Sequence, residues 1–138
     1  MTTPRNRPTR IIIAGSRSID DYGLVDAAMA QYTAGGPNRG RYEIVSGGAQ
    51  GVDKMAKRWA ERYDCEFTAF DPSRPEQTMT NYSWERDGKK AGPLRNQEMA
   101  EYGDVLVAVW DGKSPGTRDM VEKALDESLD VYVSVYDE

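Results

Sequence analysis

The eight residues Ser46–Asp53 (Ser-Gly-Gly-Ala-Gln-Gly-Val-Asp) constrain the fold of this chain more than any other stretch. They follow a short β-prone apolar run, Tyr42–Val45, and precede an amphipathic segment that extends to Tyr63. This order predicts a strand, a tight glycine-rich turn and a helix. Such a turn can present backbone N–H groups at a helix N-terminus, where the partial positive charge favours an anion.

Two interpretations of this turn stay open from the stretch alone. In the first, Gly47, Gly48 and Gly51 let the backbone approach a bulky ligand, and Ser46 adds a hydroxyl group. In the second, the turn only joins strand to helix, and Asp53 serves as an N-cap or first-turn carboxylate. Other parts of the chain decide between them.

Composition excludes several kinds of chemistry. The 138 residues predict one domain, the single Cys65 cannot form an intramolecular disulfide, and there is no histidine for Ser-His catalysis or zinc ligation. No metal site is therefore expected. The net charge of −5 argues against a protein that coats nucleic acid. Since no apolar run reaches membrane-spanning length and no signal peptide is recognisable, we expect a cytoplasmic protein without a membrane partner.

Alternating apolar runs and helical periodicities predict an α/β fold. Ile11–Ala14 is continuously apolar, as in a strand buried on both faces. Further strands are predicted at residues 42–45, 65–70, 104–109 and 131–135, and helices at residues 20–32, 52–63, 93–102 and after residue 117. The alternation predicts one doubly wound domain over residues 10–138, with about five parallel strands and helices on both faces. Residues 1–9 are expected to form a flexible basic arm.

The sequence also predicts the surroundings of large side chains in three segments. Trp59 lies on the apolar stripe of its helix and is predicted to be core, and Leu125 is assigned to the buried face of the last helix. The polar segment from Asp71 to Gly92 has no periodicity and predicts a long loop, of the kind that often forms a lid. Within it, Tyr82 and Trp84 either anchor the loop or stack on a ligand.

Three turns rich in glycine and hydroxyl groups directly follow predicted strands: Gly15-Ser16-Arg17, the central turn and Asp111–Thr117. Because the C-terminal ends of parallel strands meet at one edge, we expect the three turns to cluster there. Arg17 and Arg95 supply positive charge at this edge, which favours phosphate binding. The spacing matches neither the Walker A loop nor the Gly-x-Gly-x-x-Gly fingerprint.

Four motifs, in order along the chain, resemble the SLOG superfamily of Rossmann-like proteins. They are Gly15-Ser16-Arg17, Ser46–Asp53, Trp84 with Gly88–Asn96, and Asp111–Thr117. The last two are similar to the YspA-like, cpYpsA-related branch in particular. The resemblance implies a Rossmann-like fold, a pocket for a nucleotide or nucleotide-derived ligand, and a homo-oligomer.

Two more distant resemblances bracket the activity. The LOG phosphoribohydrolases carry a catalytic glutamate three residues after a Gly-Thr pair, where this chain has Met120, so no catalytic residue can be assigned. The DNA-processing protein A family, which shares the Gly-Ser-Arg and Ser-Gly-Gly-type motifs, binds single-stranded DNA. The acidic balance of this chain disfavours that role.

The sequence thus predicts binding of a nucleotide or nucleotide-derived ligand, such as an ADP-ribose-like signal, by its phosphate and ribose, in a sensing role. No resident cofactor is expected. One alternative is a nucleotide N-glycosidic or phosphoester hydrolase that uses Asp53, Asp111 or Asp119; another is a module for single-stranded nucleic acid or a protein partner. The predicted ligand-binding residues are Gly15, Ser16, Arg17, Ser46, Gly47, Gly48, Gly51, Asp53, Arg95, Asn96, Asp111, Gly112, Ser114, Gly116 and Thr117.

Overall fold

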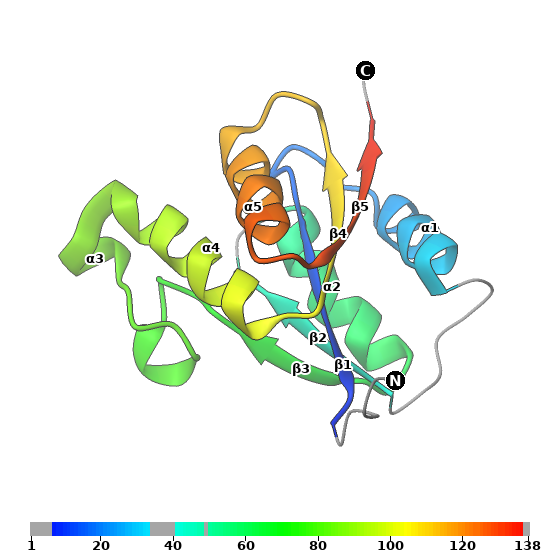
Figure 1. The fold of residues 1–138 in the computed structure, drawn as a ribbon, viewed down its shortest axis with the longest axis horizontal. Coiled ribbons are helices and arrows are strands. Elements are labelled where there is room, and N and C mark those ends of the chain that lie inside the picture. The colour runs from blue at the N-terminus through cyan, green and yellow to red at the C-terminus, as the bar shows by residue number, and fades with distance from the viewer. Residues whose placement is uncertain (1–6, 34–40, 49, 137–138) are drawn as a thin grey trace.

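A computed structural model describes residues 7–33, 41–48 and 50–136 and shows a five-stranded parallel sheet in the order β3-β2-β1-β4-β5 (Figure 1). The strands are β1 (Thr9–Gly15), β2 (Tyr42–Ser46), β3 (Glu66–Ala69), β4 (Val105–Trp110) and β5 (Asp130–Val135). The main helices are α1 (Tyr22–Thr33), α2 (Val52–Arg62), α4 (Ala91–Tyr102) and α5 (Pro115–Asp126). The predicted α/β fold with a parallel sheet is confirmed.

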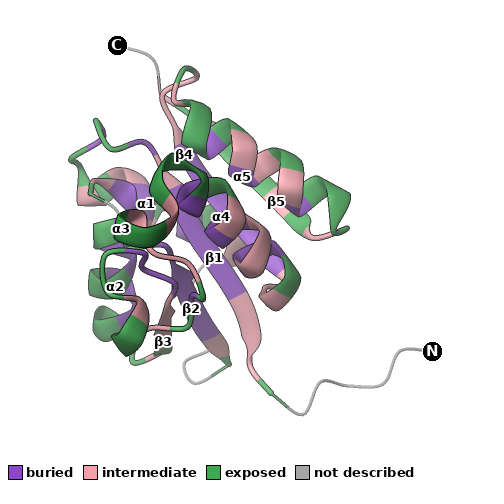
Figure 2. Cartoon of the chain, turned by 90° about the vertical axis from the view of Figure 1, so that its left-hand side faces the viewer, coloured by how far each residue is buried: buried purple, intermediate pink, exposed green. Residues whose placement is uncertain are grey.

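Helices cover both faces of the sheet, α1 and α2 on one side and α4 and α5 on the other (Figure 1). Successive residues of β1 enter the two cores in turn: Ile11 and Ile13 pack with α1 and α2, whereas Ile12 packs with α4 and α5. Each of these isoleucines is fully buried, and Figure 2 shows the central strands as the buried middle layer. A strand buried on both faces explains the unbroken apolar run.

The helix patterns are confirmed for α2 and only in part for α5. Trp59 is fully buried in the core, as predicted. Leu125, however, is 59% exposed, so its assignment to the core was wrong. The buried stripe of α5 runs through Thr117, Met120 and Ala124. Leu125 is one residue further on, about 100° around a helix of 3.6 residues per turn, and faces solvent.

The prediction of a long structureless loop over residues 71–92 was also wrong. The segment contains the 3-10 turns η1 (Pro75–Gln77) and η2 (Gly88–Lys90), separated by the short helix α3 (Trp84–Asp87). The helix α4 then begins at Ala91, two residues before the expected start at Pro93. Proline is tolerated there because the first N–H groups of a helix have no intrahelical partner.

Glu98 of α4 fixes this segment to the body of the domain. Its two carboxylate oxygens accept hydrogen bonds from the Thr80 hydroxyl (2.5 Å) and from the backbone and side-chain nitrogens of Asn81 (both 2.9 Å). These hydrogen bonds attach the middle of the segment to α4. A lid would need to be free of such contacts in order to open.

Most of the predicted N-terminal arm, residues 1–6, lies outside the described residues, as does Ala49 of the central turn. Arg7 is described, and its guanidinium donates to both carboxylate oxygens of Asp104 (2.7 and 3.1 Å). The strand β1 begins at Thr9, within the range assigned to the arm. None of the described helices is long and apolar enough to cross a membrane.

Candidate functional site

A cavity of about 620 Å³ lies at the C-terminal edge of the sheet. There, Gly15 of β1 pairs with Val109 of β4, and the strand order changes direction between these two strands. In open α/β sheets this switch point is where ligands bind. The predicted residues that line the cavity are Gly15, Arg17, Asp53, Arg95, Asn96, Asp111, Ser114, Gly116 and Thr117.

Of the described residues in the central glycine turn, only Asp53 lines the cavity. A Cβ atom on Gly47 would lie 2.4 Å from Nη1 of Arg95, and one on Gly48 would lie 2.7 Å from the Asp71 carboxylate. A Cβ atom on Gly51 would lie 2.5 Å from the Ser16 carbonyl oxygen. These glycines therefore allow close packing of protein against protein, where the sequence suggested approach to a ligand.

The first turn of α2 is likewise covered by protein. Its Val52 N–H points to the carbonyl oxygen of Ser16 at 3.5 Å. The Ser46 hydroxyl is fully buried, donates to the Asp53 carbonyl oxygen at 2.8 Å and accepts from the Gly48 N–H at 3.2 Å. Asp53 itself lies in the first turn of α2, and its carboxylate accepts from the Gly15 N–H at 3.3 Å. The central turn thus supports the residues of the cavity wall, and most of its own residues do not face the cavity.

The N-terminus of α5 lines the cavity, together with Gly92 and Pro93 from the first turn of α4. The first residues of α5, Pro115, Gly116 and Thr117, all contribute to the wall. A Cβ atom on Gly116 would meet nothing within 4 Å, so the space in front of this backbone is open. The N–H groups at the start of a 12-residue helix carry partial positive charge, which suits an anion in this space.

Arg95 and Asp53 are the two buried charged residues of the wall, each with 7% of its surface exposed. Arg95 is the buried cation. Its Nη1 donates to the carbonyl oxygens of Gly47 (2.6 Å) and Phe70 (3.2 Å), and its Nε donates to Oδ1 of Asn96 (3.0 Å). All three acceptors are neutral. These contacts hold the guanidinium in a fixed orientation without neutralising it.

Burial lowers the pKa of the Arg95 guanidinium, and the nearby positive charge of Arg17 lowers it further. The carboxylates of Asp53 and Asp71 act in the opposite direction. Because arginine starts from a pKa above 12, it remains charged at neutral pH. The cavity therefore has a permanent positive charge in its wall, partly offset by the equally buried Asp53 carboxylate, in surroundings where water screens both charges weakly.

The Asp111 carboxylate shapes the turn between β4 and α5. One oxygen accepts from the N–H groups of Ser114 (2.7 Å) and Lys113 (2.8 Å), and the other accepts from the Ser114 hydroxyl (2.9 Å). The two backbone hydrogen bonds hold the pKa of Asp111 far below its usual value. Asp111 therefore stays ionised near neutral pH and does not act as a proton donor there.

Asn96 and Asp119 connect α4 to α5. The Asn96 amide donates to Oδ2 of Asp119 (3.0 Å) and to the Gly116 carbonyl oxygen (3.4 Å). Asp119 also receives the Lys123 ammonium group at 2.7 and 2.8 Å. A carboxylate held by an ion pair and an amide is poorly available as a base, which counts against Asp119 in the hydrolase hypothesis.

Besides the residues of the central turn, two further predicted residues lie away from the cavity lining. Ser16 is buried, and its hydroxyl oxygen accepts from the Asp111 N–H at 2.9 Å, which joins the first and third turns. Gly112 has φ +79°, a value that suits glycine, within the β4–α5 turn. Both residues support the turns that line the cavity; their role in ligand binding stays a prediction.

The cavity is also lined by Ser18 and Lys89, which were not predicted as ligand contacts, and by Trp84, for which stacking on a ligand was one of two predicted roles. Trp84 packs so closely on α4 that a Cβ atom on Gly92 would lie 3.0 Å from its ring. The Arg95 guanidinium lies 5.9 Å from the centre of the same ring. Trp84 therefore anchors the segment, one of its two predicted roles, and also faces the cavity. Lys89 lies within the motif Gly88–Asn96, so this motif could have identified it as a candidate ligand contact.

The remaining cations of the lining differ from Arg95 in exposure. Arg17 and Lys89 are exposed, and neither forms an ion pair with any described residue. Within the same described ranges, no group of three Cys, Asp or Glu side chains could hold a metal ion. The lining therefore combines one fixed cation, two exposed cations, three aspartates, a helix N-terminus and an aromatic ring.

Comparison with known proteins gives relatives in sequence and in structure. The model of the YspA, cpYpsA-related SLOG family matches residues 9–75. The Gene 61 protein of Mycobacterium phage D29 is 38% identical over 116 residues, which are 83% of this chain and 87% of that protein.

Two solved structures of DNA processing protein A share the fold. The Streptococcus pneumoniae protein superposes with a TM-score of 0.68 at 19% identity, over 93% of this chain and 50% of that one. The Helicobacter pylori protein, whose structure concerns its single-stranded DNA binding mode, superposes with a TM-score of 0.66 at 22% identity, over 93% of this chain and 66% of that one. This chain thus spans only part of either protein, and the likeness confirms the Rossmann-like fold.

Proposed function

Since this chain belongs to the YspA, cpYpsA-related SLOG family, we propose that it binds a nucleotide or nucleotide-derived ligand in the cavity between β1 and β4. The observation that carries the proposal is the buried guanidinium of Arg95 beside the open N-terminus of α5. A fixed cation near the backbone N–H groups of Gly116 and Thr117 at a helix N-terminus suits a phosphate group.

The other lining residues fit the rest of such a ligand. Arg17 and Lys89 can each add a charge-assisted hydrogen bond to phosphate. Asp53 can accept hydrogen bonds from ribose hydroxyl groups, as acidic residues do in other Rossmann-like sites. A cavity of about 620 Å³ also falls within the range of small-molecule sites, which is 300–1,000 Å³.

Replacing Arg17 by alanine is expected to weaken binding of ADP-ribose by about tenfold, because one charge-assisted hydrogen bond is lost. The side chain is exposed, so the melting temperature of the unliganded protein should not change. Isothermal titration calorimetry on both proteins measures the effect.

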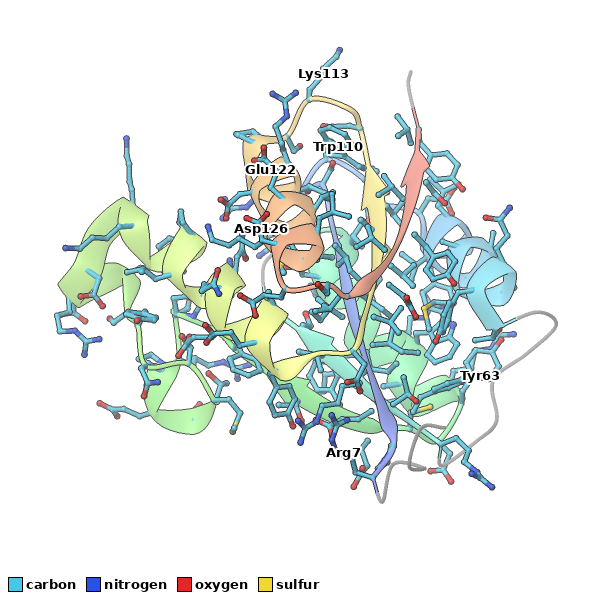
Figure 3. All side chains as sticks on the ribbon, in the orientation of Figure 1. Arg7, Tyr63, Trp110, Lys113, Glu122 and Asp126 are labelled. Carbon is cyan, nitrogen blue, oxygen red and sulfur yellow. The ribbon has the colours of Figure 1, made fainter. Side chains whose placement is uncertain are left out.

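Lys113→Ala is the matched control for this experiment. Lys113 carries the same charge and lies on the β4–α5 turn, but it is not part of the cavity lining, and Figure 3 shows it pointing away from the body of the protein. The Lys113→Ala variant should bind ADP-ribose with the affinity of the wild-type protein. Equal affinity losses in the two variants would show only a general charge effect and would remove Arg17 from the site.

Single-stranded nucleic acid is the second candidate ligand. It is favoured by the structural likeness to two DNA processing proteins, one of them studied for its single-stranded DNA binding mode. The net charge of −5 opposes it, although the exposed cations Arg17 and Lys89 lie at the cavity. If binding to an oligonucleotide weakens steeply as the salt concentration rises, this candidate is supported.

A homo-oligomeric state is proposed from the family resemblance alone.

A further inference from the structure

A second cavity, of about 650 Å³, adjoins the first, and Trp84 forms part of the wall of both. Its other lining residues all lie between Pro72 and Arg86, in the connection from β3 to α4. In Figure 1 this connection and α3 extend beyond the outer end of α4. The second cavity is thus built entirely by the segment that Glu98 fixes to the domain.

The charges in the two cavities are arranged differently. In the second cavity, Arg86 is paired with Asp87 at 2.8 Å and Arg74 with Asp71 at 3.5 Å. In the first cavity, Arg17 and Lys89 have no ion-pair partner among the described residues. The first cavity therefore keeps cations available to phosphate, although Asp53, Asp111 and Asp119 also line it. In the second cavity both arginines are paired and Glu76 and Glu85 add negative charge, so it disfavours phosphate and suits an uncharged part better.

The remaining lining of the second cavity suits a flat heterocycle. The indole ring of Trp84 offers a stacking surface, and the rings of Pro72 and Pro75 add apolar surface. The side-chain amide of Gln77 is exposed and makes no hydrogen bond with any described residue. A glutamine amide presents a donor beside an acceptor, which matches the N6 and N7 atoms of adenine.

We propose that the second cavity is a base subsite, in which a purine of the adenine type lies near Trp84 and bonds to the Gln77 amide. The phosphate and ribose of the same molecule then occupy the cavity between β1 and β4. This inference rests on the proposed function. It narrows the ligand to a nucleotide that keeps its base and excludes a bare sugar phosphate as the preferred ligand.

Calorimetric titration with AMP and with ribose 5-phosphate tests the proposal, because these compounds share the sugar phosphate and differ in the base. Wild-type protein is expected to bind AMP at least tenfold more tightly than ribose 5-phosphate. Gln77→Ala should weaken AMP binding about fivefold and leave ribose 5-phosphate binding unchanged. Met79→Ala is the control, since Met79 is exposed in the same segment and lies outside both linings.

The outcomes separate this inference from the proposed function. Equal affinity for AMP and ribose 5-phosphate would overturn the base subsite and leave the phosphate site in place. Tighter AMP binding that Gln77→Ala does not reduce would place the base elsewhere and also overturn the inference. Failure of both compounds to bind would overturn the proposed function itself.

Discussion

Replacing Gly51 by alanine is expected to lower the free energy of unfolding by roughly 3–5 kcal/mol, one of the largest effects available to a single methyl group in this protein. Gly51 has φ +73° and ψ −128°, a conformation that side chains disfavour by about 1–3 kcal/mol. The added Cβ atom would also lie 2.5 Å from the Ser16 carbonyl oxygen and 2.7 Å from that of Arg17. Both contacts are with backbone, which cannot rotate away.

Gly88→Ala is the matched control, because Gly88 has almost the same backbone conformation, with φ +65° and ψ −148°. A Cβ atom there would meet nothing within 4 Å, so only the conformational cost of about 1–3 kcal/mol applies. Urea denaturation of the two variants gives the difference, which is the cost of the clash between the central turn and the β1–α1 turn. Equal destabilisation would contradict the close packing of these two turns.

Arg95→Met is expected to reduce ADP-ribose affinity at least 100-fold, because it removes the buried cation on which the proposed phosphate site depends. It also leaves the carbonyl oxygens of Gly47 and Phe70 without their donor, which costs about 2 kcal/mol of stability. Methionine keeps much of the apolar stem, and a domain with 5–15 kcal/mol of stability survives this loss. Circular dichroism confirms folding before calorimetry measures affinity.

Arg95→Lys serves as the second variant for this position. Lysine keeps the charge but not the planar fork that reaches both carbonyl oxygens and Asn96. We expect an affinity between those of the wild type and Arg95→Met. Wild-type affinity in a folded Arg95→Met protein would show that the cation is only structural and would move the ligand away from α4.

The sequence predicted the fold well because the parallel sheet is encoded in local patterns. The apolar run Ile11–Ala14 and the regular stripe of α2 each determine one kind of element, and their alternation determines the topology. Leu125 was misplaced because periodicity alone does not determine how wide the buried stripe of a helix is: α2 buries both Trp59 and Ala60, whereas α5 buries Ala124 and leaves Leu125 exposed. The segment 71–92 was misjudged because short turns and a four-residue helix produce no periodicity.

The candidate site was predictable in position and only partly in composition. Three turns at the ends of parallel strands had to meet at one edge, and the cavity lies there. The sequence could not show which turn faces the cavity. The same glycine pattern is expected whether Gly47, Gly48 and Gly51 lie against a ligand or, as here, against other protein atoms. Close approach of backbone requires glycine in either case. Packing between distant segments decides which surface it approaches.

The most direct test of nucleotide binding is a thermal-shift panel with AMP, ADP, ADP-ribose, NAD, cyclic nucleotides and a short single-stranded oligonucleotide. A ligand present at about a hundred times its dissociation constant adds roughly 2.7 kcal/mol of stability, which raises the melting temperature of a domain this size by several degrees. We predict such a rise with one class of adenine nucleotide and a smaller rise in Arg17→Ala. A folded protein whose melting temperature does not respond to any nucleotide in the panel would contradict the proposed site.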